Sequence, residues 1–176
     1  KVSNKMETST HPFQSQPHRT LLTLSIPVLL SLTAEPITAL VDTAFISSLG
    51  IIPLAALGVG TTALTSLFWI FNFLGIGTQT EIAQVHGKGQ SNQAGKITSL
   101  ALVLALGFGL LLILTIGPSS PWLAGLLGAS GAVRENAVRY MQIRLFGAPA
   151  VLLTLVSFGA LRGLQDMRTP LWIALG

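Results

Sequence analysis

Two acidic residues interrupt an apolar stretch near the start of the chain, Glu35 and Asp42 within residues 21–47. They are seven positions apart, so on a helix both lie on one face, about 10 Å apart along the axis. Ionisable groups inside a membrane cost at least ~2.5–3.5 kcal/mol and usually face a cavity or a partner. Apolar surroundings favour the protonated acid. Each carboxyl group can therefore take up and release a proton, or bind Na⁺ with neighbouring hydroxyls such as Thr38 and Thr43.

A structural role stays open for both acids. Asp42 would then lie at the outer membrane interface, and Glu35 would pair with an arginine of a neighbouring helix. Two prolines of the same stretch, Pro27 and Pro36, each remove a backbone hydrogen bond and can kink a helix. Such kinks are common in transporters, whose helices bend between states, and in membrane helices generally.

No set of residues typical of an enzyme accompanies the two acids. The sequence has no cysteine, and therefore no disulfide and no thiolate metal ligand. It contains no HExxH motif and no glycine-rich loop of the kinds that bind phosphate groups. His86 is a single histidine in a polar loop. The sequence thus predicts no catalytic residue, no cofactor and no metal site, with H⁺ or Na⁺ as a coupling ion only.

The composition is that of a membrane protein. Half of the 176 residues are hydrophobic and 9% are charged, against roughly 25% charged residues in ordinary soluble domains. So few charges cannot cover a soluble globule, which excludes a soluble enzyme. The formal net charge of +4 is typical of the excess of Lys and Arg on the cytoplasmic side of membrane proteins. This net charge therefore does not indicate a nucleic-acid partner.

Two runs without a charged residue, 43–80 and 97–133, are the longest apolar parts of the chain. A membrane span needs about 20 apolar residues, so each run holds one span and a helix end. The predicted fold class is an all-α polytopic membrane helix bundle with about four spans and the start of a fifth. The expected spans are about 21–47, 54–79, 97–116, 145–161 and, as a start only, 170–176.

Glycines and prolines refine this arrangement. Gly159 and Gly163 form a GxxxG pattern, which is typical of close approach between membrane helices. Pro118 and Pro121 are expected to stop a helix, within a loop over residues 117–131.

The basic residues predict the topology. They occur before the first span, between the second and third, and between the fourth and fifth, at Lys1, Lys5, Arg19, Lys88, Lys96, Arg162 and Arg168. By the positive-inside rule the N-terminus is cytoplasmic. Arg134, Arg139 and Arg144 fall on the opposite side, so we expect them on an interfacial helix or pointing into the protein.

Both ends of the chain suggest a fragment. Residues 1–19 are polar, contain no apolar segment of a signal peptide and are expected to form a disordered cytoplasmic tail. The chain starts with Lys1 and stops a few residues into an apolar segment, which is too short to cross a bilayer of about 30 Å. We therefore expect residues 20–176 to be an incomplete N-terminal transmembrane lobe that lacks its C-terminal helices.

From about Arg19 onward, the chain contains four groups of short segments in a characteristic order. They are Pro27 with Val41-Asp42-Thr43-Ala44-Phe45-Ile46 and Leu49-Gly50; Pro53-Leu-Ala-Ala-Leu-Gly58; Gly77-Thr-Gln-Thr-Glu-Ile-Ala-Gln84 with Gly87; and Arg162-Gly-Leu-Gln-Asp166 with Arg168-Thr-Pro170. Together they resemble the multidrug and toxic compound extrusion (MATE) transporters, and most closely the DNA-damage-inducible-F-like branch of bacteria and plant plastids. Their order and spacing are more specific than any one segment.

The resemblance implies a twelve-helix exporter, built as two six-helix lobes about a central cleft in a bacterial inner membrane or a plastid envelope. It also implies exchange of small organic, often cationic, compounds against H⁺ or Na⁺. In this branch an aspartate and a proline of the first span matter for coupling, and Asp42 and Pro27 match them. Protonation of the aspartate would bend the helix near the proline and reshape the lobe cavity. Glu35 matches nothing in the family pattern, so its role rests on helix geometry alone.

Two alternatives remain beside the exporter. The short chain is compatible with a non-transporting truncated remnant or a membrane scaffold. A lipid-linked oligosaccharide flippase of the same superfamily is less favoured, because its cavity needs a basic lining and the first three expected spans contain no Lys or Arg.

Overall fold

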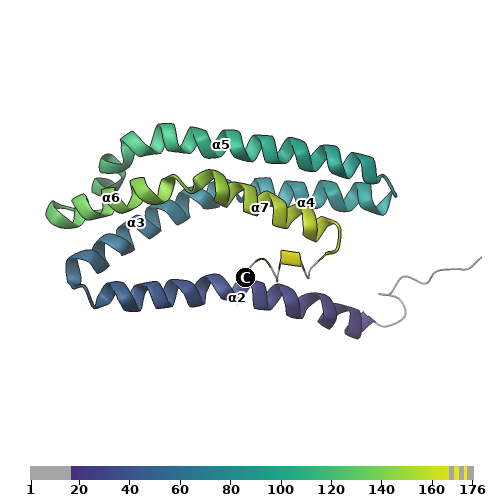
Figure 1. Cartoon of the computed structure of the whole chain (residues 1–176), viewed down its shortest axis with the longest axis horizontal. Coiled ribbons are helices and arrows are strands. Elements are labelled where there is room, and N and C mark those ends of the chain that lie inside the picture. The colour runs from purple at the N-terminus through teal and green to yellow at the C-terminus, as the bar shows by residue number, and fades with distance from the viewer. Residues whose placement is uncertain (1–16, 167–168, 171–172, 174–176) are drawn as a thin grey trace, which may run out of the picture.

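The described part of the chain is built of α-helices (Figure 1). A computed structural model describes residues 17–166, 169–170 and 173. The helices are α2 (Pro17–Ser47), α3 (Ile51–Ile70), α4 (Asn72–Gly87), α5 (Ser91–Leu126), α6 (Gly131–Leu145) and α7 (Ala148–Gly163). The expected all-α bundle is confirmed.

Two of the expected segments fall largely outside this description. Of the expected tail, residues 1–16 are outside it, and residues 17–19 form the first turn of α2. Most of the expected start of a fifth span, at 170–176, is outside it as well.

Two helical stretches among the described residues are long and apolar enough to cross a bilayer. Residues 51–87 (α3 and α4, separated by Phe71 alone) form a helical stretch of 37 residues, and α5 has 36. At 1.5 Å per residue each is about 55 Å long, which exceeds a hydrocarbon core of about 30 Å. A third span results among the described residues if α6 and α7, bent by 53° at their junction, count as one. Within α2, the shorter segment Pro36–Ser47 is apolar.

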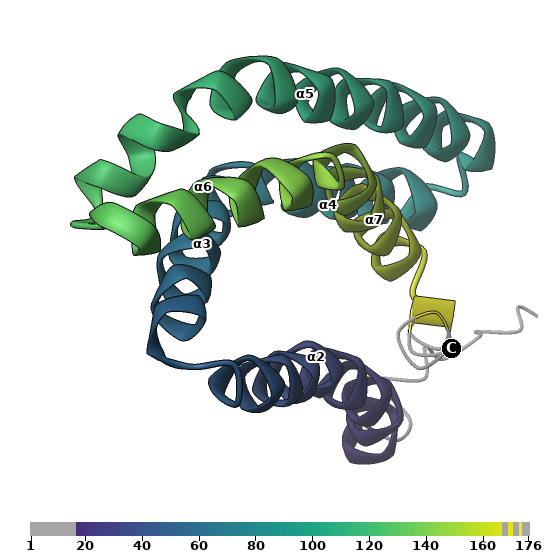
Figure 2. The same cartoon turned by 60° about the vertical axis from the view of Figure 1, so that its left-hand side comes forward.

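The helices other than α2 pack against one another. Helix α7 lies along α4 and α5, and α6 lies along α3 and α5. Helix α2 contacts α3, to which the turn at Gly50 joins it, and stands largely apart from the others (Figure 2). Gly50 has a φ of 113°, a backbone conformation that residues with a Cβ atom rarely adopt.

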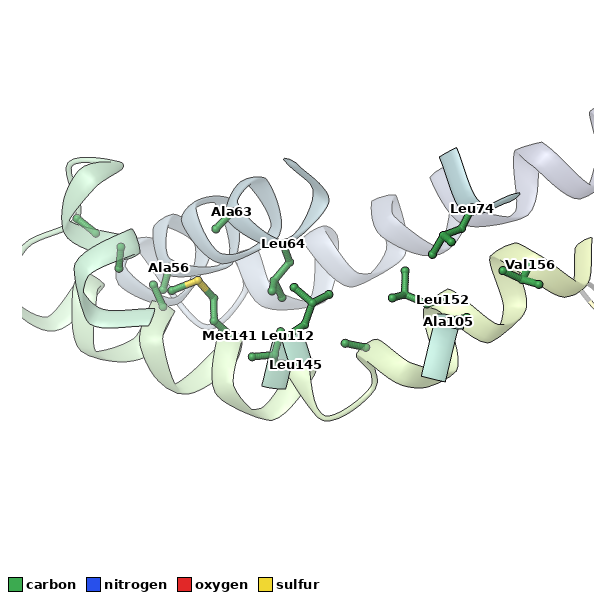
Figure 3. Packing of buried hydrophobic residues seen from close by; sticks show 14 residues of the cluster. Ala56, Ala63, Leu64, Leu74, Ala105, Leu112, Met141, Leu145, Leu152 and Val156 are labelled. Carbon is green, nitrogen blue, oxygen red and sulfur yellow. The ribbon is translucent and has the colours of Figure 1, made fainter. Parts of the chain in front are cut away.

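The main cluster of buried side chains lies among α3, α4, α5, α6 and α7 (Figure 3). It includes Leu64, Leu112, Met141, Leu145 and Leu152, each at most 4% exposed. Because lipid tails are as apolar as this cluster, helices in a membrane associate mainly through van der Waals packing rather than through the hydrophobic effect. The described side chains of α2 contribute none of the buried residues.

The GxxxG pattern lies at the contact between α7 and α4, as the sequence predicts. A Cβ atom at Gly159 would meet the backbone of Gly75, and one at Gly163 would lie 2.7 Å from the backbone oxygen of Gln79. Only glycine therefore allows these two helices to approach so closely.

The predicted loop at 117–131 is wrong, because α5 continues through Pro118 and Pro121 to Leu126. A proline has no N–H group, so Pro121 leaves the carbonyl oxygen of Gly117 without its helical partner. The hydroxyl group of Ser120 donates a hydrogen bond to that oxygen at 2.8 Å. Side-chain hydroxyls commonly satisfy backbone groups that proline frees in membrane helices, and the turn therefore starts later, at Leu127.

Candidate functional site

A cavity of about 1060 Å³ lies between α2 on one side and α3, α4, α6 and α7 on the other. Helix α5 contributes nothing to its lining, because it packs behind α6 and α7 (Figure 2). Pockets for small organic ligands have volumes of about 300–1,000 Å³. The cavity is thus large enough for a drug-sized compound.

The α2 side of the cavity carries Asp42 together with Thr38 and Thr43. Asp42 is exposed, and Thr38 lies one helical turn before it on the same face. The Thr43 hydroxyl donates a hydrogen bond to the carbonyl oxygen of Ala39 at 2.7 Å, which leaves lone pairs of the hydroxyl oxygen for a ligand. This side can therefore offer one carboxyl group and hydroxyl oxygens to a proton, to Na⁺ or to a basic nitrogen.

For the other two predicted coupling residues, the structure describes only the backbone. Pro27 and Glu35 belong to helix α2, and their side chains lie outside the described part of the chain. Their predicted roles stay predictions. Among the described residues, no group of three or more His, Cys, Asp or Glu side chains could hold a metal ion.

The facing walls of the cavity carry uncharged polar side chains from three helices: Thr61, Thr65, Asn72, Gln79 and Thr154. The hydroxyl of Thr61 donates to the carbonyl oxygen of Leu57 at 2.7 Å, and that of Thr154 to the carbonyl oxygen of Ala150 at 2.9 Å. Since their protons are used within their own helices, these hydroxyls present acceptor oxygens to a ligand.

Two arginines also line the cavity, Arg144 of α6 and Arg162 of α7. The Arg144 guanidinium donates a hydrogen bond to the Tyr140 hydroxyl at 2.9 Å and lies 5.8 Å from the centre of its ring. Arg162 is half-buried, and its buried Nε atom has no hydrogen-bond partner among the described residues. No ion pair joins Asp42 to either arginine within the described chain.

The packing of α6 determines which way Arg144 faces. Met141 and Leu145, one turn apart, are buried against the rest of the bundle (Figure 3). Tyr140 and Arg144 precede them by one position each and form the adjacent row, which lines the cavity. At the start of α6, the Arg134 Nε atom donates to the carbonyl oxygen of Pro121 at 3.1 Å. Rotation of α6 would therefore break both the apolar contacts and this bond.

The three arginines that the topology prediction places on the outer side of the membrane have different surroundings in the structure. Arg134 binds the backbone of α5, Arg144 lines the cavity, and Arg139 is exposed and not part of the lining. The sequence allowed Arg144 to point into the protein, but it did not predict that Arg144 and Tyr140 line one cavity together. The available signal was their i, i+4 spacing, which places a basic and an aromatic side chain side by side on a helix.

Three comparisons with known proteins agree. The family model MatE matches residues 27–176. The chain is 35% identical to the DNA damage-inducible protein F of Escherichia coli K12 over 159 residues, which cover 90% of this chain and 35% of that protein. It is 30% identical to the chloroplastic protein DETOXIFICATION 44 of Arabidopsis thaliana, covering 86% of this chain and 32% of that one.

A solved structure gives the same result for the fold. It is the outward-facing conformation of a multidrug resistance MATE family transporter of the MOP superfamily, with a TM-score of 0.83 and 28% sequence identity. The match covers 90% of this chain and 35% of the other. The chain thus spans about a third of the length of the relatives that it matches.

Proposed function

The chain belongs to the MATE family, and on this premise we propose that it forms the N-terminal portion of a secondary active exporter of small organic compounds, driven by inward movement of H⁺ or Na⁺ in exchange. The observation that carries the proposal is the exposed Asp42 carboxyl group on the wall of a cavity of about 1060 Å³. An antiporter needs one site whose occupation by an ion weakens the binding of the substrate.

The Asp42 carboxylate is the acidic group among the described lining residues, and it supports exchange of a basic group against a cation. Among the described lining residues, ionised Asp42 contributes −1, and Arg144 and Arg162 contribute +1 each, so the net charge is −1 + 2 = +1. Protonation of Asp42, or Na⁺ bound to it, raises the net charge to +2. A basic group held by the carboxylate then loses its counter-charge and is released.

Helix α2 is the element that we propose to respond to the ion. Its described side chains include no buried residue, and among the described residues it contacts mainly α3, so its displacement disrupts little of this packing. Pro27, within this helix, is the proposed bending point, and Glu35 the proposed second acid. We further propose that the N-terminus is cytoplasmic, in a bacterial inner membrane or a plastid envelope.

Replacement of Asp42 by Asn in the complete transporter tests the proposal. The amide keeps the shape of the side chain but neither ionises nor exchanges a proton. In proteoliposomes with an imposed H⁺ or Na⁺ gradient, D42N should lose gradient-driven transport of a basic dye while its yield stays unchanged. Glu81→Gln is the matched control, because Glu81 is exposed and not part of the cavity lining. Transport by D42N at the wild-type rate would remove the basis of the proposal, and the gradient that drives the wild type distinguishes H⁺ from Na⁺.

A further inference from the structure

Arg144 is one of two arginines among the described residues that line the cavity. Its guanidinium carries five N–H donors, of which one binds the Tyr140 hydroxyl at 2.9 Å. Within the described chain this is the one hydrogen bond of the Arg144 side chain, and no described carboxylate is paired with it. The remaining donors are therefore available to an acceptor that enters the cavity.

The position of Arg144 is set by a chain of contacts that starts on α3. A Cβ atom at Gly60 would collide with the ring of Tyr140, with Cε1 at 3.0 Å, so this ring lies directly on the backbone of α3. The ring and its hydroxyl in turn hold the guanidinium. The Arg144 side chain is exposed, so a ligand can reach it, and a carboxylate can accept two parallel hydrogen bonds from a guanidinium.

We propose that Arg144 is a binding subsite for an oxyanion group of the transported compound. Asp42 and Arg144 line one cavity from different helices, α2 and α6, so a compound with a basic nitrogen and a separate carboxylate or sulfonate can contact both. The inference rests on the proposed exporter function for the role of Asp42, and it narrows the substrate class to zwitterionic organic compounds. The direction of exchange is preserved, because protonation of Asp42 still releases the basic end.

Equilibrium binding to the complete, purified transporter tests the subsite without any transport step. The probes are rhodamine B, which carries a free carboxylate, and its methyl ester, which is otherwise the same dye. In detergent micelles the wild type should bind the acid about tenfold more tightly than the ester, as expected for one charge-assisted hydrogen-bonded pair. Arg144→Gln should abolish this preference and leave the affinity for the ester within about twofold.

Arg139→Gln is the matched control, because it removes the same charge from the same helix outside the cavity lining. It should keep the preference for the acid. Tyr140→Phe removes only the hydroxyl that holds Arg144 and should reduce the preference in part. Equal binding of both dyes by the wild type, or an equal loss of both in Arg144→Gln, would overturn the proposal.

The phosphate of a lipid headgroup could supply the same oxyanion to Arg144. Binding measured with and without surrounding anionic lipid distinguishes this source from the transported compound. Binding is repeated in nanodiscs of phosphatidylglycerol. A preference for the acid that persists there supports the transported compound as the source, and one that disappears only there assigns the subsite to lipid and overturns the proposal. Failure of the exporter function would show separately, as absence of gradient-driven transport with the binding preference intact.

Discussion

A methyl group added at Gly159 tests the close contact between α7 and α4. The new Cβ atom would meet the carbonyl oxygen of Gly75, with the carbonyl carbon at 3.1 Å and the Cα atom at 3.2 Å. All three atoms belong to the backbone, so no side chain can turn away and the helices must separate. Over-packing of this kind costs about 1–3 kcal/mol.

The same substitution at Gly77 of α4 provides the control, because no atom lies within 4 Å of a Cβ atom there. Exchange of glycine for alanine inside a helix contributes roughly 0.5–1 kcal/mol of stability in either variant. This gain cancels between Gly159→Ala and Gly77→Ala, so their difference isolates the over-packing cost of about 1–3 kcal/mol.

Unfolding in mixed micelles of dodecyl maltoside and sodium dodecyl sulfate, followed by circular dichroism, measures the difference. Gly159→Ala should unfold at a lower fraction of sodium dodecyl sulfate than the wild type, and Gly77→Ala at an equal or higher fraction. Equal stability of the two variants would refute the assignment of Gly159 to a backbone contact between α7 and α4.

Two other predictions concern the end of α5. Ser120→Ala should lower the free energy of unfolding by about 0.5–1.5 kcal/mol, because it removes the hydrogen bond to the half-buried Gly117 carbonyl oxygen. Ser119→Ala should have little effect in the same titration, since that side chain is exposed. Arg134→Gln removes the bond to the Pro121 carbonyl oxygen and should speed amide hydrogen exchange in residues 127–134, as measured by mass spectrometry; unchanged exchange there would contradict this role.

The candidate site was only partly predictable from the sequence. Asp42 stands out in the sequence because an acidic side chain within an apolar stretch is energetically unfavourable in a membrane. In the structure it lines the cavity. Arg144 carries no such signal, because a basic residue in a polar helical segment is ordinary. Its importance depends on the ring of Tyr140 and on the space left by Gly60, contacts between α6 and α3 that lie 80 positions apart in the sequence.

The prolines of α5 illustrate the limit of local rules. Pro118 and Pro121 favour a helix end when only the missing backbone hydrogen bonds are considered. The helix continues because the Ser120 hydroxyl satisfies the freed carbonyl oxygen of Gly117 and because the segment packs against α6. Both contacts depend on neighbours that a rule for single residues does not include.

The sequence alone determines that this protein is an all-α membrane protein of the MATE family, since apolar runs, sparse charges and ordered motifs depend only on residue type and spacing. It also identifies Asp42 as the leading candidate for coupling. The tertiary structure alone decides which polar groups share a cavity with that acid. Helix rotation and bending set this arrangement, and both follow from contacts between residues distant in the chain.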